Sequence, residues 1–486
     1  MDSLLPLIAL LVGIVTVIGL IIAVRLNAFV ALTIAALVVA MMATTESLRQ
    51  YPQDLAAMKG EVWSDSQVEK FVASNAPTRV ASAFGTSAGN IAIVIAMAAI
   101  IGKCLMDSGA ADRIVRSFLK LLGQKGAPVA LLSSGFVLSI PVFFDTVFYL
   151  LVPLARSLWK STRKNYMLYI LAIGAGAAIT HTLVPPTPGP LIIAENLGVD
   201  LGMMILIGSL VGLATAAVTL PVCLVMNRWL DMPMRPYAGE EEISPLSDEE
   251  LPPLWLSLAP IVLPVLMIST HTITSQVAKG LGGSETLTRV TGITGLLGNP
   301  NLALLLSAAV AMWILVAYRK LTLTELGKRT ETALMSGGVI ILITAAGGAF
   351  GIALQQAGVK QAILDFVGSN GQDMGLMMLV LGFGVASIMK IAQGSSTVAM
   401  IVTSSMIAAM GVTREMLGCH PVYLCTAIGA GSLVGSWMND SGFWIVSRMS
   451  GLTEVETLKA WTVILVIVGS IAFGFSLLFA KLLPLV

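Results

Sequence analysis

The sequence predicts an all-α polytopic membrane protein with about ten transmembrane helices and two re-entrant hairpins, arranged as two inverted-topology repeats. The first observation is composition: of 486 residues, 56% are hydrophobic and only 11% are charged, and the mean hydropathy is +0.89. A soluble chain would carry about 25% charged residues. The second observation is a pair of long apolar runs that are interrupted near their middles. The third is the pentapeptide AIGAG, which occurs at Ala172–Gly176 and again at Ala427–Gly431.

Charge and cysteine content exclude several other classes of protein. A net charge of +1 offers no basic surface for nucleic acid, so we expect no nucleic-acid partner. The four cysteines are Cys104, Cys223, Cys419 and Cys425, and their spacing fits neither a zinc site nor a disulfide framework. Lone thiols in apolar helices are usually packing residues. We therefore expect no metal site and no cofactor.

Apolar runs of about 20 residues, the length that crosses a bilayer, locate the spans. Those of the first half are Leu4–Val24, Ala28–Ala43, Gly89–Met106, Tyr166–Val184 and Leu201–Asn227. Those of the second half are Leu254–Thr270, Asn301–Tyr318, Ala333–Leu354, Val422–Val434 with its continuation, and Trp461–Leu483. The first run follows no basic segment, so we interpret it as a retained helix and not as a signal peptide. The predicted domains are a first repeat at residues 1–230, a linker at 231–253 and a second repeat at 254–486.

Two longer apolar runs, residues 127–158 and 376–410, do not fit a single span. The first is broken at Pro141 and the second at Gln393–Thr397. Each half of these runs is too short to cross the bilayer comfortably, and irregular backbone is not tolerated against lipid. We therefore interpret both runs as re-entrant hairpins.

Basic residues predict the orientation, because cytoplasmic loops of membrane proteins are enriched in Lys and Arg. With both termini outside and each hairpin returning to its own side, the clusters Arg113–Lys125, Arg156–Lys164 and Arg319–Arg329 all fall inside. The acidic, proline-flanked stretch Glu240–Glu250 then forms a cytoplasmic linker between the halves.

The two halves also share an order of segments. Gly102 and Gly109 have the same spacing as Gly351 and Gly358, and each pair precedes an amphipathic segment, a broken hairpin and an AIGAG helix. The amphipathic segments are Ala111–Leu122 and Val359–Val367. AIGAG by itself could be a packing motif, since small residues are common in membrane helices. An odd number of spans in each half places the second half upside down, which is the architecture of many secondary transporters.

Four polar breaks interrupt the apolar segments. Two are the hairpin turns. The other two interrupt the helices that carry AIGAG, which extend over residues 166–193 and 422–448. Repeat symmetry should bring these breaks together near the midplane, where helix N-termini suit an anion and hydroxyl or amide side chains suit hydroxyl groups. The predicted substrate-binding residues are Pro141, Phe144, Thr146, Thr182, Thr187, Gly189, Lys390, Gln393, Gly394, Ser395, Ser396, Thr397, Asn439 and Ser441. Lys390 could instead extend its ammonium group to the membrane interface.

Three titratable side chains are candidates for carrying a coupling proton. Asp145 stands between Phe144 and Thr146, in an apolar setting that favours a neutral carboxyl, although it could simply cap a helix. Asp440 belongs to a sequence that also suits a turn. His181 is next to a break, but a lone histidine can equally be a hydrogen-bonded core residue. We rank Asp145 first.

Several of these stretches together resemble the gluconate permease (GntP) family of proton symporters, in the ion transporter superfamily. The resembling stretches are Gly102 with Asp107–Ala111, Ile140–Asp145, His181 with Pro185–Pro190, Ala392–Ser395 and Asn439–Trp444. The resemblance implies import of gluconate-like sugar acids across a bacterial inner membrane, with relatives that carry fructuronate or D-serine. It also implies paired hairpins, a homodimer and an elevator-type motion. The chain departs from the family pattern at Thr187, at Lys390 and in the longer loop Glu46–Arg79.

The leading hypothesis is therefore proton-coupled uptake of gluconate or a related small hydroxylated carboxylate, with the substrate, protons and the bilayer as partners. A sodium-coupled carboxylate transporter is the alternative, since unwound backbone beside Ser396 or Asn439 could hold sodium. We do not expect an enzyme, because no HExxH, GxSxG or P-loop motif occurs. A channel is a further alternative, but paired hairpins favour an occluded site.

Overall fold

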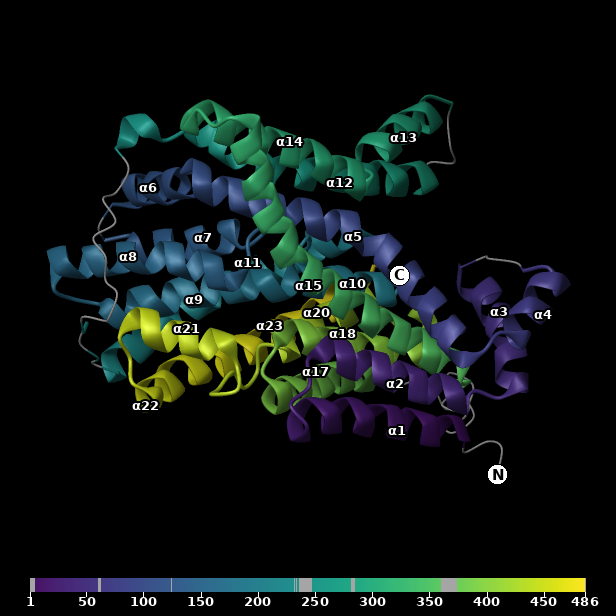
Figure 1. Ribbon diagram of the computed structural model, residues 1–486. Helices are drawn as coiled ribbons and strands as arrows, with labels where there is room; N and C mark the ends of the chain where they lie inside the picture. Colours follow the sequence, from purple (N-terminus) through teal and green to yellow (C-terminus); the bar gives the residue numbers. More distant parts are fainter. Residues whose placement is uncertain are drawn as a thin grey trace.

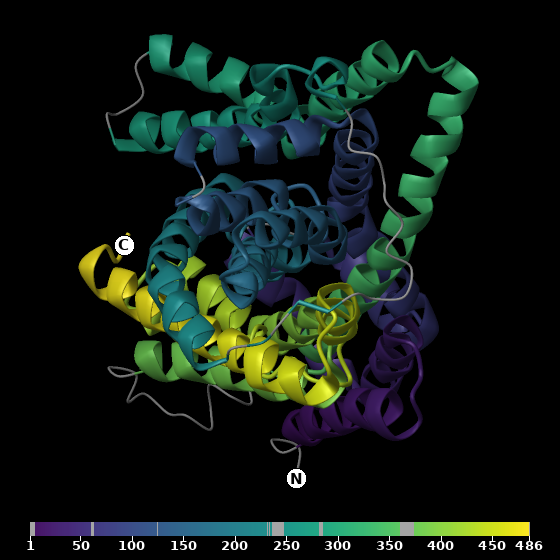
Figure 2. The same cartoon turned by 90° about the vertical axis from the view of Figure 1, so that its left-hand side faces the viewer.

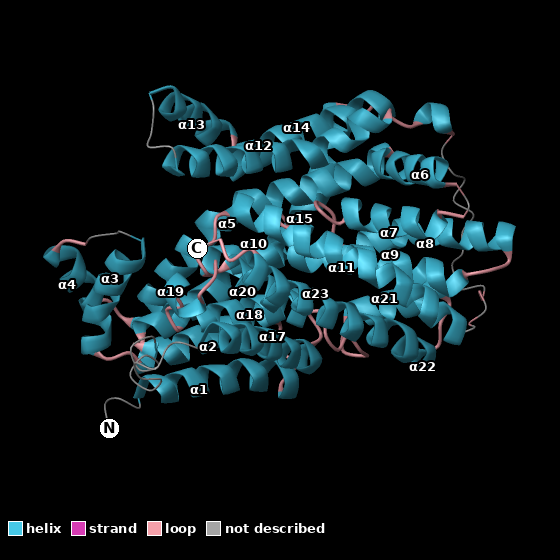
Figure 3. Ribbon diagram, turned by 180° about the vertical axis from the view of Figure 1, so that it is seen from behind, coloured by secondary structure: helices cyan, strands magenta, loops and turns pink. Residues whose placement is uncertain are grey.

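The computed structural model describes residues 5–59, 63–123, 125–230, 232, 234–235, 247–280, 285–359 and 374–485. Every regular element in this part of the chain is a helix, which confirms the predicted all-α class (Figures 1 and 3). Among the described residues, eight helices are long and apolar enough to cross a membrane, and a ninth span results if α2 and the start of α3, which meet at 106°, are taken together. The chain is thus a multi-pass membrane protein, although not every predicted span is a full-length helix.

In the first half, the helices are α1 (Leu5–Ile18), α2 (Ala28–Met42), α3 (Thr45–Lys59), α4 (Asp65–Ala73), α5 (Ala76–Ser108), α6 (Ala110–Leu122), α7 (Ala127–Leu138), α8 (Phe144–Thr162), α9 (Tyr166–Leu183), α10 (Pro188–Asn196) and α11 (Leu201–Trp229). A short π-helix, Gly19–Ala23, follows α1, so the first predicted span is divided into two pieces. The predicted loop Glu46–Arg79 consists largely of α3 and α4, and its last residues begin α5.

In the second half, the helices are α12 (Leu254–Gly280), α13 (Glu285–Leu297), α14 (Pro300–Arg319), α15 (Leu323–Gln356), α17 (Met374–Gln393), α18 (Ser396–Ala409), α19 (Arg414–Leu417), α20 (Val422–Gly431), α21 (Ser441–Ser450), α22 (Glu454–Thr457) and α23 (Val463–Leu482). A π-helix, Leu458–Thr462, joins α22 to α23. Most of the predicted amphipathic segment Val359–Val367 and most of the predicted linker lie outside the described residues. The predicted span at Val422 is the short helix α20.

Several helix–helix contacts in the first half have similar contacts in the second half. The long helices α5 and α15 pack on each other, while α2 packs on α15 and α14 packs on α5. The first hairpin arm, α7, lies on α9, and its counterpart α17 lies on α20. Likewise α11 packs on α9, and α23 packs on α20. The hairpins and the interrupted helices therefore lie together, between an edge formed by α12–α14 and an edge formed by α1 and α2 (Figures 1 and 2).

The glycines that recur between the halves occupy equivalent structural positions. A Cβ atom on Gly176 would lie 2.2 Å from the Leu132 carbonyl oxygen of α7, and one on Gly431 would lie 2.2 Å from the Phe383 carbonyl oxygen of α17. The last glycine of each AIGAG motif thus lets the first arm of its own hairpin approach the backbone closely. Side chains at these two positions would separate the arm from the helix.

The other recurring pair marks helix ends. Gly109 follows α5 with a φ of 80°, and Gly358 follows α15 with a φ of 81°. This left-handed conformation commonly ends helices and favours glycine. The second glycine of each spaced pair therefore ends a long helix in the same way, whereas Gly102 and Gly351 lie inside α5 and α15.

Charged contacts gather at the end of the bundle that contains α6 and α22, on the left in Figure 1. Arg113 Nε donates to the Pro252 carbonyl oxygen at 2.8 Å, and Arg116 pairs with Asp248 at 2.8 Å. The Arg116 hydrogen bond lowers the pKa of the Asp248 carboxyl. Arg329 pairs with Asp107 at 2.6 Å. The basic clusters that the sequence assigned to one side therefore lie at one end of the helices, and α3 and α4 lie at the other.

Candidate functional site

The helices are interrupted at the four places that the sequence marked. The first hairpin turns between Leu138 and Phe144, and the second turns between Gln393 and Ser396. In the second hairpin, Gly394 has a φ of 87°, a left-handed value that suits glycine. The breaks in the AIGAG helices separate α9 from α10, in the proline-rich segment, and α20 from α21, at residues 432–440.

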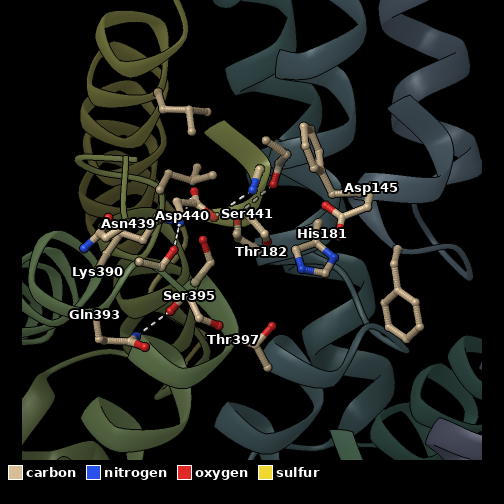
Figure 4. Close-up of a pocket in the computed structure, with 18 of the residues that line it drawn as sticks. Asp145, His181, Thr182, Lys390, Gln393, Ser395, Thr397, Asn439, Asp440 and Ser441 are labelled. Atoms are coloured by element: carbon tan, nitrogen blue, oxygen red, sulfur yellow. Dashed lines mark hydrogen bonds and ion pairs between the residues drawn. The ribbon is translucent and has the colours of Figure 1, made fainter. Parts of the chain in front are cut away.

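Three of these breaks surround a central cavity of about 500 Å³ (Figure 4). The predicted residues that line it are Phe144, Asp145, Thr146, His181, Thr182, Lys390, Gln393, Gly394, Ser395, Ser396, Thr397, Asn439, Asp440 and Ser441. They come from the hairpin tips, from the last turn of α9 and from the start of α21. The structure thus brings together residues that are far apart in the chain, in a volume that suits a small metabolite.

Three predicted binding residues lie elsewhere. Thr187 is buried, and its hydroxyl donates to the Val184 carbonyl oxygen at 2.6 Å. Gly189 faces Met400, because α10 packs against α18. The carbonyl of Pro141 approaches Gly102. The proline-rich segment and α10 therefore pack against α18 of the second hairpin. Only the last residues of α9, which precede this segment, reach the cavity.

Several lining residues were not predicted from the sequence. Ser336 and Ile340 of α15 form part of the wall, and so do Trp461 and Leu465 near the start of the last span. Ser336 is a polar residue in a predicted span, and one serine in such a span is only a weak indication of a binding site. Nothing local distinguishes the other three residues, because their position depends on how distant helices pack.

A buried ion pair forms one wall of the cavity. Lys390 Nζ lies 2.6 Å from Asp440 Oδ2, and the two side chains are only 3% and 10% exposed. The same ammonium group donates to the Gly394 carbonyl oxygen at 2.6 Å. Asp440 also accepts hydrogen bonds from the Ser436 hydroxyl and from the Gly442 backbone N–H. Lys390 therefore points into the protein and not toward the membrane interface.

Further hydrogen bonds fasten the second hairpin tip to the break after α20. The side chains of Trp437 and Asn439 each donate to the Ile391 carbonyl oxygen at 2.8 Å. The Ser396 hydroxyl donates to the Ser432 carbonyl oxygen, also at 2.8 Å. The hairpin tip and the break thus form one connected unit around the ion pair.

Three helix N-termini face the cavity, those of α8, α18 and α21, since the first residues of each line it. Ser395 caps α18 through its hydroxyl, and Asp440 caps α21 through its carboxylate. The first turn of α8 has no side-chain cap from Phe143. Backbone N–H groups and the positive ends of helix dipoles therefore converge on this space, which is an arrangement that suits an anion.

Asp145 and His181 lie on the wall opposite the Lys390–Asp440 pair (Figure 4). Within the described residues, the Asp145 carboxyl has no ion pair or hydrogen bond, and the Nδ1 atom of His181 is buried without a partner. Asp145 is therefore the carboxyl group at the cavity that is free to interact with a ligand or a proton. No group of three or more His, Cys, Asp or Glu residues in the described part of the chain could hold a metal ion.

A family model described as GntP family permease matches residues 71–482. The chain belongs to the GntP permease family. It is therefore a membrane transport protein and not an enzyme.

Several similar proteins carry names that state a substrate, and two examples follow. A gluconate permease of Zymomonas mobilis is 33% identical, over 79% of this chain and 84% of its own length. The low-affinity gluconate transporter of Escherichia coli is 29% identical, over 80% of this chain and 84% of its own. An uncharacterized permease of Haemophilus influenzae is 31% identical, over 98% of this chain and 92% of its own length.

Solved transporter structures share the fold at low sequence identity. The YdaH transporter of Alcanivorax borkumensis superposes with a TM-score of 0.62 at 14% identity, covering 93% of this chain and 99% of its own. MtrF of Neisseria gonorrhoeae gives a TM-score of 0.58 at 16% identity, covering 84% of each chain. Both likenesses concern the arrangement of helices.

Proposed function

We propose that this GntP permease is a secondary active transporter that imports gluconate, or a related small hydroxylated carboxylate, together with protons. The observation that carries the proposal is the central cavity, where three helix N-termini meet an unpaired carboxyl group, Asp145. The names of the gluconate permease relatives support the choice of substrate.

The chemistry of the cavity fits each part of such a substrate. The helix N-termini attract the carboxylate, and Lys390, whose charge is balanced by Asp440, holds the hairpin tip beside them. Side chains of Gln393, Thr397 and Ser441 line the same space and offer donors and acceptors for hydroxyl groups. A volume of about 500 Å³ leaves room for the substrate and a few waters.

The placement of Asp145 supports proton coupling. An ionised Asp145 would repel a carboxylate in the same cavity, whereas a protonated one removes that repulsion and can donate a hydrogen bond. Proton and substrate should therefore bind together. Asp440 is less suited to this role because Lys390, Ser436 and Gly442 already occupy its carboxylate, and His181 remains the second candidate.

The sodium-coupled alternative finds less support at the hairpin tip. A sodium site there would need backbone carbonyl oxygens that are free to coordinate the ion. The carbonyls of Ile391, Gly394 and Ser395 instead accept hydrogen bonds from protein side chains. Proton coupling is therefore the function that we propose.

The transport cycle that we propose uses the repeat architecture. Residues 1–230 and 254–486 form two inverted repeats, with hairpins 127–158 and 376–410 entering from opposite sides and both termini outside the bacterial inner membrane. The hairpins and interrupted helices move as an elevator along α5 and α15, and the protein works as a homodimer. The reciprocal packing of the two halves and the equivalent roles of Gly176 and Gly431 support this arrangement.

Uptake of labelled gluconate into proteoliposomes tests the proposal. An acidic outside medium without sodium should drive accumulation above equilibrium, and a protonophore should abolish it. Accumulation that needs a sodium gradient and ignores the pH gradient would support the alternative. Gluconate flux at single-channel rates, with no accumulation under either gradient, would indicate a channel.

A further inference from the structure

A second cavity, of about 420 Å³, lies at the opposite end of the bundle from the charged contacts of α6. Its walls come from α3, α4, α5 and α15, with contributions from α10 and α18. We call it the outer cavity, because the predicted orientation places α3 and α4 outside (Figure 1). It shares no lining residue with the central cavity, and both are present in the same conformation.

One wall of the outer cavity is a polar stripe on a membrane helix. Thr78, Ser82, Thr86 and Asn90 recur every fourth residue along α5, so they lie on one face. Polar residues in a membrane helix are costly unless they have partners or face water. All four side chains of the stripe are exposed, and the first three precede the predicted span Gly89–Met106, so they face the open end of the cavity where a ligand can reach them.

The opposite wall supplies amide groups from the end of α15. Gln355 and Gln356 both line the cavity, and within the described residues neither side-chain amide has a hydrogen-bond partner. Each amide can both donate and accept, which suits ligand hydroxyl groups. These groups are available where a hydroxylated ligand would lie between α5 and α15.

The charged side chains of the cavity favour an anion. Arg79 is only 7% exposed; its terminal nitrogens donate to the carbonyl oxygens of Ser74 and Ala40, and its buried Nε has no partner. Lys70 adds a second positive charge at the rim. Among the described residues of the lining, Glu195 is the one acid, and its carboxylate accepts a hydrogen bond from the Asn90 amide at 2.6 Å. These described residues therefore carry one more positive charge than negative.

The helices α3 and α4 roof the cavity with a cluster of aromatic rings. The rings of Tyr51 and Phe71 stack with centroids 5.7 Å apart, and Trp63 meets Phe71 edge-on at 5.4 Å. Arg49 of α3 pairs with Glu69 of α4 at 2.5 Å and joins the two helices. Aromatic faces beside hydroxyl and amide groups suit a carbon chain that bears hydroxyls.

We propose that the outer cavity is a second binding site for a small hydroxylated carboxylate, occupied at the same time as the central cavity. Lys70 and Arg79 attract the carboxylate, and Gln355, Gln356 and the α5 stripe bind the hydroxyls. The proposal rests on the proposed function for its ligand class. The site would raise the local concentration of substrate at the outer end of the protein.

Two tryptophans allow the sites to be observed separately. Trp63 lines the outer cavity, and Trp461 lines the central one. Gluconate added to the purified full-length protein in lipid nanodiscs should change tryptophan emission in two saturable steps. Trp63→Phe should remove one step and keep the other, and Trp461→Phe should do the reverse.

Variants of the lining sharpen this test. The double variant Lys70→Gln with Gln355→Ala removes a charge and an amide from the outer cavity. It should weaken the affinity for gluconate in the step that Trp63 reports by about tenfold or more. The same variant should leave the affinity of the Trp461 step unchanged. Lys481→Gln, which removes an exposed positive charge on α23 outside both cavities, is the matched control and should alter neither step.

The outcomes separate this proposal from the transport proposal. A single step that survives Trp63→Phe, or a Trp63 step that the double variant does not weaken, overturns the outer site and leaves gluconate transport intact. Absence of both steps, together with absence of gluconate uptake in proteoliposomes, overturns both proposals.

Discussion

Asp145 and Asp440 both face the central cavity, but the protein surrounds them differently. Asp440 forms a salt bridge with Lys390, accepts two further hydrogen bonds and caps α21. Asp145 stands in the first turn of α8 without such partners in the described part of the chain. Asp440 is therefore suited to hold the site together, and Asp145 is suited to respond to protons and substrate.

Replacing Asp145 with asparagine should separate binding from coupling. The asparagine side chain mimics a neutral carboxyl, so Asp145→Asn should still exchange labelled for unlabelled gluconate across proteoliposomes. It should lose accumulation driven by a pH gradient, because no proton is bound with the substrate. Asp112→Asn, which removes an acidic residue of α6 away from the cavity, is the control. Normal pH-driven accumulation by Asp145→Asn would rule out this role and direct attention to His181.

The Lys390–Asp440 pair should behave as one unit. Lys390→Gln leaves a buried carboxylate without its counter-charge, and breaking such a pair typically costs about 3–5 kcal/mol. The double variant Lys390→Gln with Asp440→Asn removes both charges and should therefore melt at a higher temperature than Lys390→Gln. Thermal unfolding in detergent measures this difference, and uptake assays should show poor transport in both variants. If the two single substitutions destabilise additively, the pair does not act as a unit.

At the scale of elements, the second hairpin tip depends on a close approach between two backbones. A Cβ atom on Gly394 would lie 2.2 Å from the Asn439 carbonyl oxygen, and the residue has a positive φ. The hairpin tip and the break before α21 can therefore meet only if this position lacks a side chain. This contact sets the distance between Lys390 and Asp440.

Gly394→Ala should disrupt this contact. The left-handed conformation alone costs an L-residue about 1–2 kcal/mol, and the overlap with Asn439 adds to it. We expect a lower melting temperature and strongly reduced gluconate uptake. Gly384→Ala is the matched control on the helix that precedes Gly394, α17, because a Cβ there meets nothing within 4 Å. That change should be neutral or stabilising by up to about 1 kcal/mol. Equal effects of the two substitutions would show that the contact is unimportant.

At the scale of the whole molecule, charge distinguishes the two ends of the helical bundle. At one end, Arg113 and Arg116 join α6 to the segment before α12, and Arg329 joins the start of α15 to the end of α5. The helices α3 and α4 lie at the other end (Figures 1 and 3). Because basic residues accumulate on the cytoplasmic side of membrane proteins, the first end should face the cytoplasm.

Cysteine labelling checks this orientation. All four native cysteines are buried, so they should give little background with a membrane-impermeant maleimide. Ser66→Cys on α4 should react in right-side-out vesicles, and Lys164→Cys between α8 and α9 should react only in inverted ones; both positions are exposed. The opposite pattern would invert the proposed topology, and labelling of both from one side would reject it.

The sequence by itself determined the class of protein and the places where its helices break. Hydropathy, prolines such as those after His181, and glycines such as Gly394 act locally, so their effects can be predicted without knowing which segments meet. The sequence also named most of the residues around the central cavity, because polar side chains in membrane segments must find partners or face a wet cavity.

Only the tertiary structure decided which of those residues share a site. Lys390 and Asp440 are 50 residues apart, and their pairing depends on the packing of a hairpin tip against a helix break. The same packing directs Thr187 and Gly189 toward α18, brings Ser336 and Trp461 to the cavity wall, and encloses the outer cavity beneath α3 and α4. These features arise from contacts between distant segments, and the local propensities that predict helices and breaks carry no information about them.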